Sequence, residues 1–341
     1  MIGGGTWEGA PMLDMRRREF ITLLGGAAAW PLAARAQQPA MPLVGFINGG
    51  SPDAATSFGA AFRKGLAETG YVEGQNVTVE YHWLDGRYER LPSLMAELVR
   101  RRVDVIATPG ATPAALAAKA ATTTIPIVFG VAEDPVKLGL VASLAKPGGN
   151  ATGINFFAQE IVAKRLGLLH ELVPKAVRVA VLVNPANAFT AETTVQAMPE
   201  AARAIGVQIR VLKASTSREI EVAFASFMTE PADALFVAAD GFFNSRRVQF
   251  ATLAARQAIP TAHANRQAVE AGGLMSYGTD IADMFRQVGA QTGQILKGAK
   301  AAELPVLQST KFDFVINLQT ARALGIEVPN SVQSLADEVI E

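Results

Sequence analysis

Short apolar runs alternate with longer amphipathic segments along most of the chain. Residues 43–47 form an apolar run that ends in a turn with two glycines, and apolar side chains then recur every three or four residues over 54–68. The first pattern is typical of a buried strand, and the second of a helix that covers it. By the same criteria, the predicted strands are 43–47, 77–83, 103–108, 125–130, 178–183, 207–212, 234–238, 261–264 and 273–277. The predicted helices are 54–68, 90–101, 112–121, 161–172, 191–205, 217–228, 245–257 and 281–297, followed by a short helix that ends near residue 325.

The alternation of strands and helices predicts the fold class. Buried strands that alternate with amphipathic helices form parallel sheets with helices on both faces. The pattern occurs in two halves of similar length, so we predict an α/β protein with two doubly wound, Rossmann-like lobes. No low-complexity linker separates the halves, which favours a hinge of several short crossings. We assign residues 37–155 plus 278–302 to the first lobe and 156–277 plus 303–341 to the second.

Residues 1–36 have the pattern of an upstream extension and an export signal rather than of a fold. Arginines 16–18 precede an apolar run over 20–34, and Ala34-Arg35-Ala36 follows as a cleavage motif. The arginines indicate a Tat-type signal, cleaved after Ala36, and a periplasmic protein that is not inserted in the membrane afterwards. An ordinary Sec signal or an uncleaved anchor is the alternative. The true start is either Met1 or Met15.

Composition excludes several classes of function. Lys plus Arg and Asp plus Glu both number 31, so the sequence carries no basic excess for nucleic acid. Cys is absent and His occurs three times, which argues against disulfides, lipidation at cysteine and a metal cluster. We found no G-x-S-x-G elbow, no phosphate-binding P-loop and no dinucleotide fingerprint. We therefore expect no cofactor.

Polar and glycine residues gather where the predicted strands end. In open α/β sheets, ligands bind beyond the carboxyl ends of the strands. The loops 48–53 and 108–113 each pair a hydroxyl residue with a following proline, the pattern of a capped helix start whose free N–H groups favour a carboxylate. A capped helix without a ligand is the alternative. The candidate contacts in these two loops are Asn48, Ser51, Thr108, Gly110, Ala111 and Thr112.

The second half offers candidates at the equivalent strand ends. Asp240 is suited to pair with a ligand ammonium group, or else only caps a helix. Phe189, Phe242 and Phe243 are candidates to stack on an aromatic body, or else belong to the core. The remaining candidate contacts are Asn184, Asn265 and Tyr277, the last as a hydroxyl donor from the hinge.

Several separated segments resemble one known family. The segments 65–77, 134–141 and 147–153, with the C-terminal stretches 276–278, 295–298 and 304–306, are similar to the ABC transporter substrate-binding protein family that includes tryptophan- and tyrosine-binding components. The resemblance implies a type I periplasmic binding protein fold, an exported receptor and an inner-membrane ABC permease as partner. It also implies that Gly110-Ala111-Thr112 corresponds to the segment that holds an amino-acid carboxylate in related receptors.

These observations predict a monomeric solute receptor that closes two lobes around a small organic ligand, an amino acid or an aromatic carboxylate, and performs no chemistry. The rival is an exported α/β hydrolase that uses Asp134 or Asp240 with His263 as acid or base. A third interpretation, the ligand-sensing part of a two-lobed repressor, is disfavoured by the export signal and by the lack of a basic helix-turn-helix segment.

Overall fold

The fold is described from a computed structural model, which describes residues 1, 3–5, 41–52, 56–156 and 159–341. The chain divides into two compact units, Met1–Met41 and Pro42–Glu341. The predicted export signal and its cleavage site belong to the first unit and lie outside the described residues. Within the described part, no helix has the length and apolar character needed to span a membrane. The second unit holds the whole predicted α/β fold.

The first lobe is built on a six-stranded sheet whose paired strands all run parallel, in the order β11-β5-β4-β3-β1-β2. Side chains alternate between its faces, so Val105 and Ala107 enter one core cluster and Ile106 enters the other. The strands are β1 (Leu43–Asn48), β2 (Thr78–Trp83), β3 (Val105–Pro109), β4 (Ile127–Val131), β5 (Ala151–Asn155) and β11 (Leu307–Gln308).

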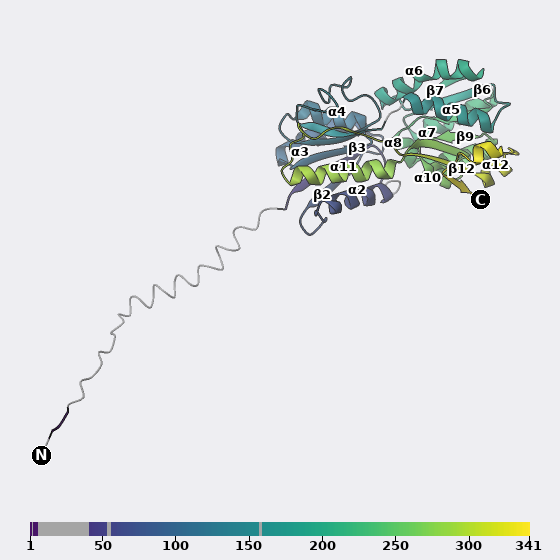
Figure 1. Cartoon of the computed structure of the whole chain (residues 1–341). Helices are drawn as coiled ribbons and strands as arrows, with labels where there is room; N and C mark the ends of the chain where they lie inside the picture. Colours follow the sequence, from purple (N-terminus) through teal and green to yellow (C-terminus); the bar gives the residue numbers. More distant parts are fainter. Residues whose placement is uncertain (2, 6–40, 53–55, 157–158) are drawn as a thin grey trace. The chain divides into compact units, whose positions relative to one another are not determined.

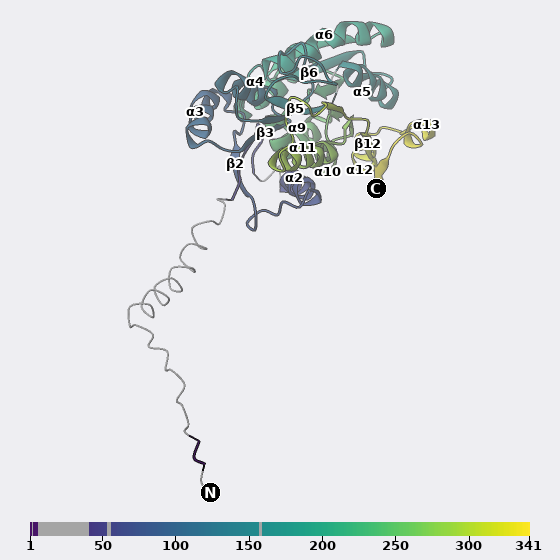
Figure 2. The same cartoon turned by 60° about the vertical axis from the view of Figure 1, so that its left-hand side comes forward.

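Helices cover both faces of this sheet. One face carries α3 (Leu91–Arg101), preceded by the short η2 (Tyr88–Arg90), and α4 (Thr112–Ala121). The other carries α2 (Thr56–Glu68) and α11 (Ile281–Leu296), which lie side by side in both Figure 1 and Figure 2 although they are far apart in sequence. The tail of the chain thus returns to complete the core of the first lobe.

The second lobe is built on a seven-stranded sheet in the order β13-β12-β10-β9-β8-β6-β7, parallel except where β10 meets β12. Its strands are β6 (Arg178–Val183), β7 (Gln208–Lys213), β8 (Ala234–Val237), β9 (Thr261–His263), β10 (Met275–Thr279), β12 (Phe312–Asn317) and β13 (Glu338–Ile340). Its helices are α5 (Gln159–Leu172), α6 (Ala188–Ile205), α7 (Ser217–Ala225), η3 (Ser226–Met228), α8 (Gly241–Ser245), α9 (Arg247–Gln257), α10 (Arg266–Glu270), α12 (Leu318–Ala323) and α13 (Asn330–Gln333).

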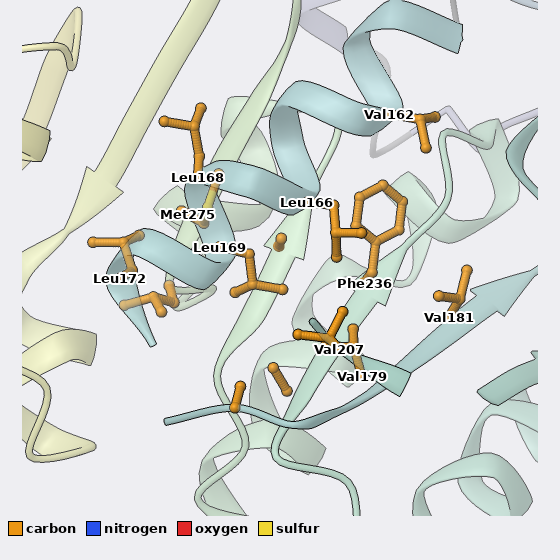
Figure 3. Close-up of a cluster of buried hydrophobic side chains, with 14 of the residues drawn as sticks. Val162, Leu166, Leu168, Leu169, Leu172, Val179, Val181, Val207, Phe236 and Met275 are labelled. Carbon is orange, nitrogen blue, oxygen red and sulfur yellow. The ribbon is translucent and has the colours of Figure 1, made fainter. Parts of the chain in front are cut away.

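Apolar side chains of α5 anchor this helix to the second sheet. The α5 side chains of Val162, Leu166 and Leu169 form one buried cluster with Val181 and Phe236 from the strands (Figure 3). Burial of such side chains is the main favourable term in folding. On the opposite face, a second cluster joins the sheet to α7, α8 and α9. The prediction of two doubly wound lobes is therefore confirmed.

Sheet membership corrects two of the expected lobe boundaries. The strand β10 stays in the second sheet up to Thr279, two residues past the expected boundary. The short strand β11 pairs with β5 of the first sheet, although residues 303–308 were assigned to the second lobe. The physical reason is Val306, which is buried in the first-lobe core and whose N–H donates to the carbonyl of Leu144 over 2.8 Å.

Three short segments cross between the lobes and form the hinge. The hydroxyl of Thr279 donates to the carbonyl of Phe156 over 2.9 Å, which ties the second crossing to the first. The N–H of Asp280 donates to the carbonyl of Lys311 over 3.0 Å, which ties it to the third. Hydrogen bonds between the crossings restrict the lobes to a hinge motion rather than free rotation.

The aromatic cluster under α2 provides a test of the first-lobe core. Phe46 is fully buried, and the centroid of its ring lies 5.0 Å from those of Phe62 and Tyr81 and 5.4 Å from that of Trp83. We expect Phe46→Ala to lower the free energy of unfolding by about 3–5 kcal/mol, because it leaves a cavity in a packed core. Urea unfolding followed by the fluorescence of Trp83 measures this. Met228→Ala, at an exposed position, is the control, and a loss below about 1 kcal/mol for Phe46→Ala would contradict the packing described.

Candidate ligand site between the lobes

A cavity of about 70 Å³ lies where the carboxyl ends of the strands of both sheets face each other. This is the position at which doubly wound sheets bind ligands. One part of the lining is apolar and comes mainly from the first lobe: Phe58, Gly110, Ala132, Phe156, Ile281, Met284 and Phe285. The other part is polar and comes mainly from the second lobe: Asn48, Thr112, Asn187, Thr190, Asp240, Asn244, Ser245 and Asn265.

The apolar wall is formed by helices α2 and α11. The rings of Phe58 and Phe285 stack with their centroids 4.9 Å apart and their planes 22° apart. Ile281, one turn before Phe285 on α11, and the adjacent Met284 also line the cavity. A wall of this kind fits an apolar or aromatic ligand body, because aromatic rings favour offset-stacked or edge-to-face partners.

Asn48 holds the two strand-end loops of the first lobe together. Its Nδ2 donates to the carbonyl of Pro109 over 2.8 Å, and its Oδ1 accepts from the N–H of Gly50 over 2.8 Å. Gly110 lies beside it with a φ of 68°, in the left-handed region that favours glycine. The first predicted loop and the second are thus joined through one buried amide.

Thr112 begins helix α4 but does not cap it, which corrects the expected capping role. The N-cap residue is Ala111, whose methyl side chain offers no acceptor. The hydroxyl of Thr112 instead donates to Oε2 of Glu133 over 2.6 Å. Its single proton is therefore committed. Pro113 has no N–H and the N–H of Ala114 donates to the carbonyl of Ala111 over 2.9 Å, so the first turn of α4 offers a ligand the N–H of Thr112.

Glu133, which follows β4, joins the two lobes. Its Oε2 accepts from Thr112 of the first lobe, and its Oε1 accepts from the hydroxyl of Thr190 of the second lobe, each over 2.6 Å. The carboxylate is buried between them. The neighbouring Asp134 caps its own turn as expected, because its Oδ1 accepts from the N–H of Val136 over 2.8 Å.

Asp240 is the central polar group of the second lobe. As N-cap of α8, its Oδ1 accepts from the N–H of Phe243 over 3.2 Å, and the amides of Asn184 and Asn187 donate to its two oxygens over 3.1 Å each. Burial raises the pKa of Asp240, and the amide donors oppose this by favouring the ionised form. Asp240 therefore both caps a helix and lines the cavity.

Further contacts hold the lobes against each other. The N–H of Ser51 donates to Oγ of Ser245 over 2.8 Å. The guanidinium of Arg246 reaches both carboxylate oxygens of Asp85 at 3.1 Å and lies 5.0 Å from the centroid of the Phe242 ring. Asp85 belongs to the first lobe and Arg246 to the second, so this ion pair joins the two lobes.

The structure brings half of the predicted site residues to the cavity. These are Asn48, Gly110, Thr112, Asp240 and Asn265. Ser51 contributes its backbone N–H to the contact between the lobes.

The other predicted residues lie behind the cavity wall or away from it. Thr108 and Ala111 are fully buried in the first lobe, and Asn184 supports Asp240 from behind. Tyr277 lies within β10, opposite Phe314, and its ring stacks on Phe312 at 6.2 Å. It was expected at a strand end, but β10 continues to Thr279, so the ring belongs to a sheet face and does not line the cavity.

Phe189, Phe242 and Phe243 were considered as stacking partners for the ligand. Phe242 and Phe243 are core residues of the second lobe, and Phe189 is 44% exposed. The aromatic wall consists instead of Phe58, Phe156 and Phe285.

Sequence reasoning missed the residues one helical turn beyond the strand-end loops. Thr190 and Asn244 lie in the first turns of α6 and α8, directly after loops that were already selected. Extending each loop by one turn would have included both. The wall residues of α11 have no such signal, because they reach the cavity only through the return of the tail.

The residues of the hydrolase alternative have separate structural roles. His263 is buried, and its Nε2 lies 3.0 Å from Oγ1 of Thr261. Burial, together with the charge of Arg165, lowers the pKa of His263 to about 3, so the ring stays neutral. Asp134 caps a turn and Asp240 caps a helix. In the described ranges, no group of His, Asp and Glu side chains is arranged to hold a metal ion.

Two hinged α/β lobes with a cavity between their strand ends define a solute-binding protein. Residues 44–340 match the family described as ABC transporter substrate binding protein, and the chain belongs to this family. Members of this class bind a small molecule and work with an ABC permease.

Similar proteins have been characterised or solved. The chain is 28% identical over 266 residues to a tyrosine-binding protein of Clostridioides difficile (strain R20291). The aligned region covers 78% of this chain and 76% of the relative. A solved structure from Streptococcus pneumonia, an ABC domain in complex with L-Trp, is 27% identical and has a TM-score of 0.78, covering 88% of this chain and 100% of that one. The ligand-free, open structure of a substrate-binding protein with adhesive properties from Clostridium difficile is 27% identical, with a TM-score of 0.60 and coverage of 88% and 99%.

Proposed function

We propose that this protein binds an aromatic L-amino acid of the tyrosine and tryptophan class between its lobes and delivers it to an inner-membrane ABC permease. The observation that carries the proposal is the division of the cavity into a stacked aromatic wall, formed by Phe58 and Phe285, and a polar wall centred on the carboxylate of Asp240. An aromatic amino acid has the same division. The tyrosine-binding relative and the L-Trp complex support the same ligand class.

The charges around the cavity support an ammonium-bearing ligand. Asp240 lines the cavity and Glu133 borders it, whereas the described lining residues include no lysine and no arginine. An ammonium group bound at Asp240 balances the negative charge of its carboxylate, whereas a neutral ligand leaves this charge unpaired. The ligand carboxylate is then expected at the N–H of Thr112, at the N-terminus of α4.

Closure of the cleft is part of the proposed function. The L-Trp complex and the ligand-free, open structure have equal sequence identity to this chain and cover it equally. The TM-score of this structure is 0.78 with the L-Trp complex and 0.60 with the open structure, so its fold is more similar to that of the complex. A cavity of about 70 Å³ is small beside the several hundred Å³ of typical ligand pockets, so the lobes must separate to admit an amino acid. A ligand that favours the closed form shifts the population toward the form that the permease recognises.

The cellular setting belongs to the same proposal. The arginines before the apolar run over 20–34 support export through the Tat route, cleavage after Ala36 and a periplasmic location. The protein needs no cofactor for this role and has no part in chemistry on its ligand.

Isothermal titration calorimetry of residues 37–341 tests the ligand class. We expect saturable binding of L-tyrosine or L-tryptophan. Tyramine, which lacks the carboxylate, and 3-(4-hydroxyphenyl)propionate, which lacks the ammonium group, should each bind about 10- to 100-fold more weakly, because each loses a charge-assisted hydrogen bond. Equal or tighter binding of the acid without an ammonium group would contradict the assignment of Asp240. Binding of sugars alone would overturn the ligand class.

A further inference from the structure

Asn244 lines the cavity with an unused side-chain amide. The residue lies in α8 and is 9% exposed. Its backbone N–H donates to the carbonyl of Asp240 over 3.0 Å, and its carbonyl accepts from Arg247 over 3.3 Å. Its side-chain Oδ1, in contrast, is enclosed and has no hydrogen-bond partner among the residues that the structure describes.

The neighbouring asparagines differ from Asn244 in this respect. The side-chain oxygens of Asn48 and Asn184 accept from the N–H groups of Gly50 and Ala186, and that of Asn187 accepts from the hydroxyl of Thr190. Buried amide oxygens in folded proteins are nearly always paired, because an unpaired acceptor has lost its water without a replacement. An unpaired buried acceptor on a residue that lines a ligand cavity therefore indicates a donor that arrives with the ligand.

The position of Asn244 indicates which donor this is. Asp240 and Asn244 are four residues apart, at the N-cap and in the first turn of the same short helix, and both line the cavity. Side chains at this spacing lie on one face of a helix. A ligand ammonium group bound to Asp240 has two further N–H bonds, one of which can reach the neighbouring acceptor.

We propose that Oδ1 of Asn244 accepts a hydrogen bond from the ammonium group of the ligand, which makes Asn244 a specificity-determining residue for α-amino acids over the corresponding acids. This rests on the proposed function, since it needs an ammonium group at Asp240. Asn244 thus completes a two-point ammonium site. Asp240 supplies the negative charge, and Asn244 supplies a second acceptor that orients the ammonium group.

The test compares Asn244→Leu, which removes the amide at nearly constant volume, with Asn244→Asp, which keeps an acceptor. Affinities are measured by calorimetry, and by competition for weak ligands, for L-tyrosine, L-phenylalanine and 3-(4-hydroxyphenyl)propionate. We expect N244L to bind L-tyrosine about 10- to 100-fold more weakly and to lose most of the preference for L-tyrosine over the acid, while N244D retains binding. The melting temperature of unliganded N244L should be unchanged or higher, because the substitution removes a buried oxygen that has no partner among the described residues.

Other outcomes overturn the inference in distinguishable ways. If N244L loses the preference for L-tyrosine over L-phenylalanine instead, the amide pairs with the ring hydroxyl. If its unliganded form melts at a clearly lower temperature with the preferences intact, Asn244 is structural. If the wild-type protein binds L-tyrosine and L-tryptophan but N244L is unaffected, this inference alone fails. If the wild-type protein binds no aromatic amino acid, the proposed function fails with it.

Discussion

Asp240→Asn should abolish most of the affinity for an aromatic amino acid. The carboxylate is partly buried, and Asn184 and Asn187 both donate to it. An asparagine at this position has one acceptor oxygen, so one of these two amides meets an NH₂ group instead, and the ligand ammonium loses its counter-charge. Truncating one partner of a buried charge pair costs about 2–5 kcal/mol, which is roughly a 30- to 5,000-fold loss of affinity.

Calorimetry with L-tyrosine and L-tryptophan measures the effect of Asp240→Asn. The matched control is Asp134→Asn, because Asp134 is exposed and only caps a turn, which an asparagine also does. A loss of less than about fivefold for Asp240→Asn would remove Asp240 as the ammonium partner.

The affinity of the wild-type protein should also fall on acidification. Burial raises the pKa of Asp240, so its carboxylate takes up a proton at a higher pH than an exposed aspartate does. Below that pKa the neutral carboxyl no longer attracts an ammonium group. The dependence should be absent in Asp240→Asn, and a pH dependence that persists in this variant would assign it to another group.

Gly241→Val should prevent closure of the cleft without unfolding either lobe. A Cβ on Gly241 would lie 3.0 Å from the backbone N of Gly50 and 3.1 Å from the carbonyl carbon of Gly49, both in the first lobe. Backbone atoms cannot move aside as a flexible side chain does, so any larger residue holds the lobes apart. Since the proposed ligand contacts come from both lobes, we expect a loss of affinity of at least about 100-fold, equal to about 3 kcal/mol.

Small-angle X-ray scattering with and without ligand separates loss of closure from loss of fold. The wild-type protein should become more compact on adding L-tyrosine or L-tryptophan, whereas Gly241→Val should not, and its unliganded melting temperature should stay within a few degrees of the wild type. Gly167→Ala is the control, because a Cβ there meets no atom within 4 Å and alanine favours the helix. Normal compaction of Gly241→Val would contradict the closing contact.

The fold could be predicted largely from the sequence because its signals are local. The helix over 112–121 and the strand over 178–183 were predicted with the bounds that the structure has. Elements of only a few residues were missed, since α8 and β11 are too short to show a period. The assignment of 303–308 to the second lobe failed for this reason, because only the pairing of β11 with β5 reveals where the edge strand belongs.

Cavity residues that follow a predicted strand in the sequence were selected as candidates. Residues that only the tertiary structure brings to the cavity were missed. Asn48 and Asp240 follow buried strands, so the strand-end rule located them. The same rule misplaced Tyr277, because its strand runs two residues further than the apolar pattern does. Glu133 was not among the predicted site residues, and Phe285 reaches the cavity from a helix near the end of the chain. Neither position carries a local signal of its role.

The central claim is that the lobes close around an aromatic amino acid whose ammonium group is bound at Asp240. The most direct test is a crystal structure of residues 37–341 with L-tyrosine or L-tryptophan. We predict the aromatic ring of the ligand against Phe58 and Phe285, the ammonium group within hydrogen-bond distance of Asp240, and the Asp85–Arg246 ion pair formed. A ligand carboxylate at Asp240, or a ligand bound outside this cavity, would contradict the account.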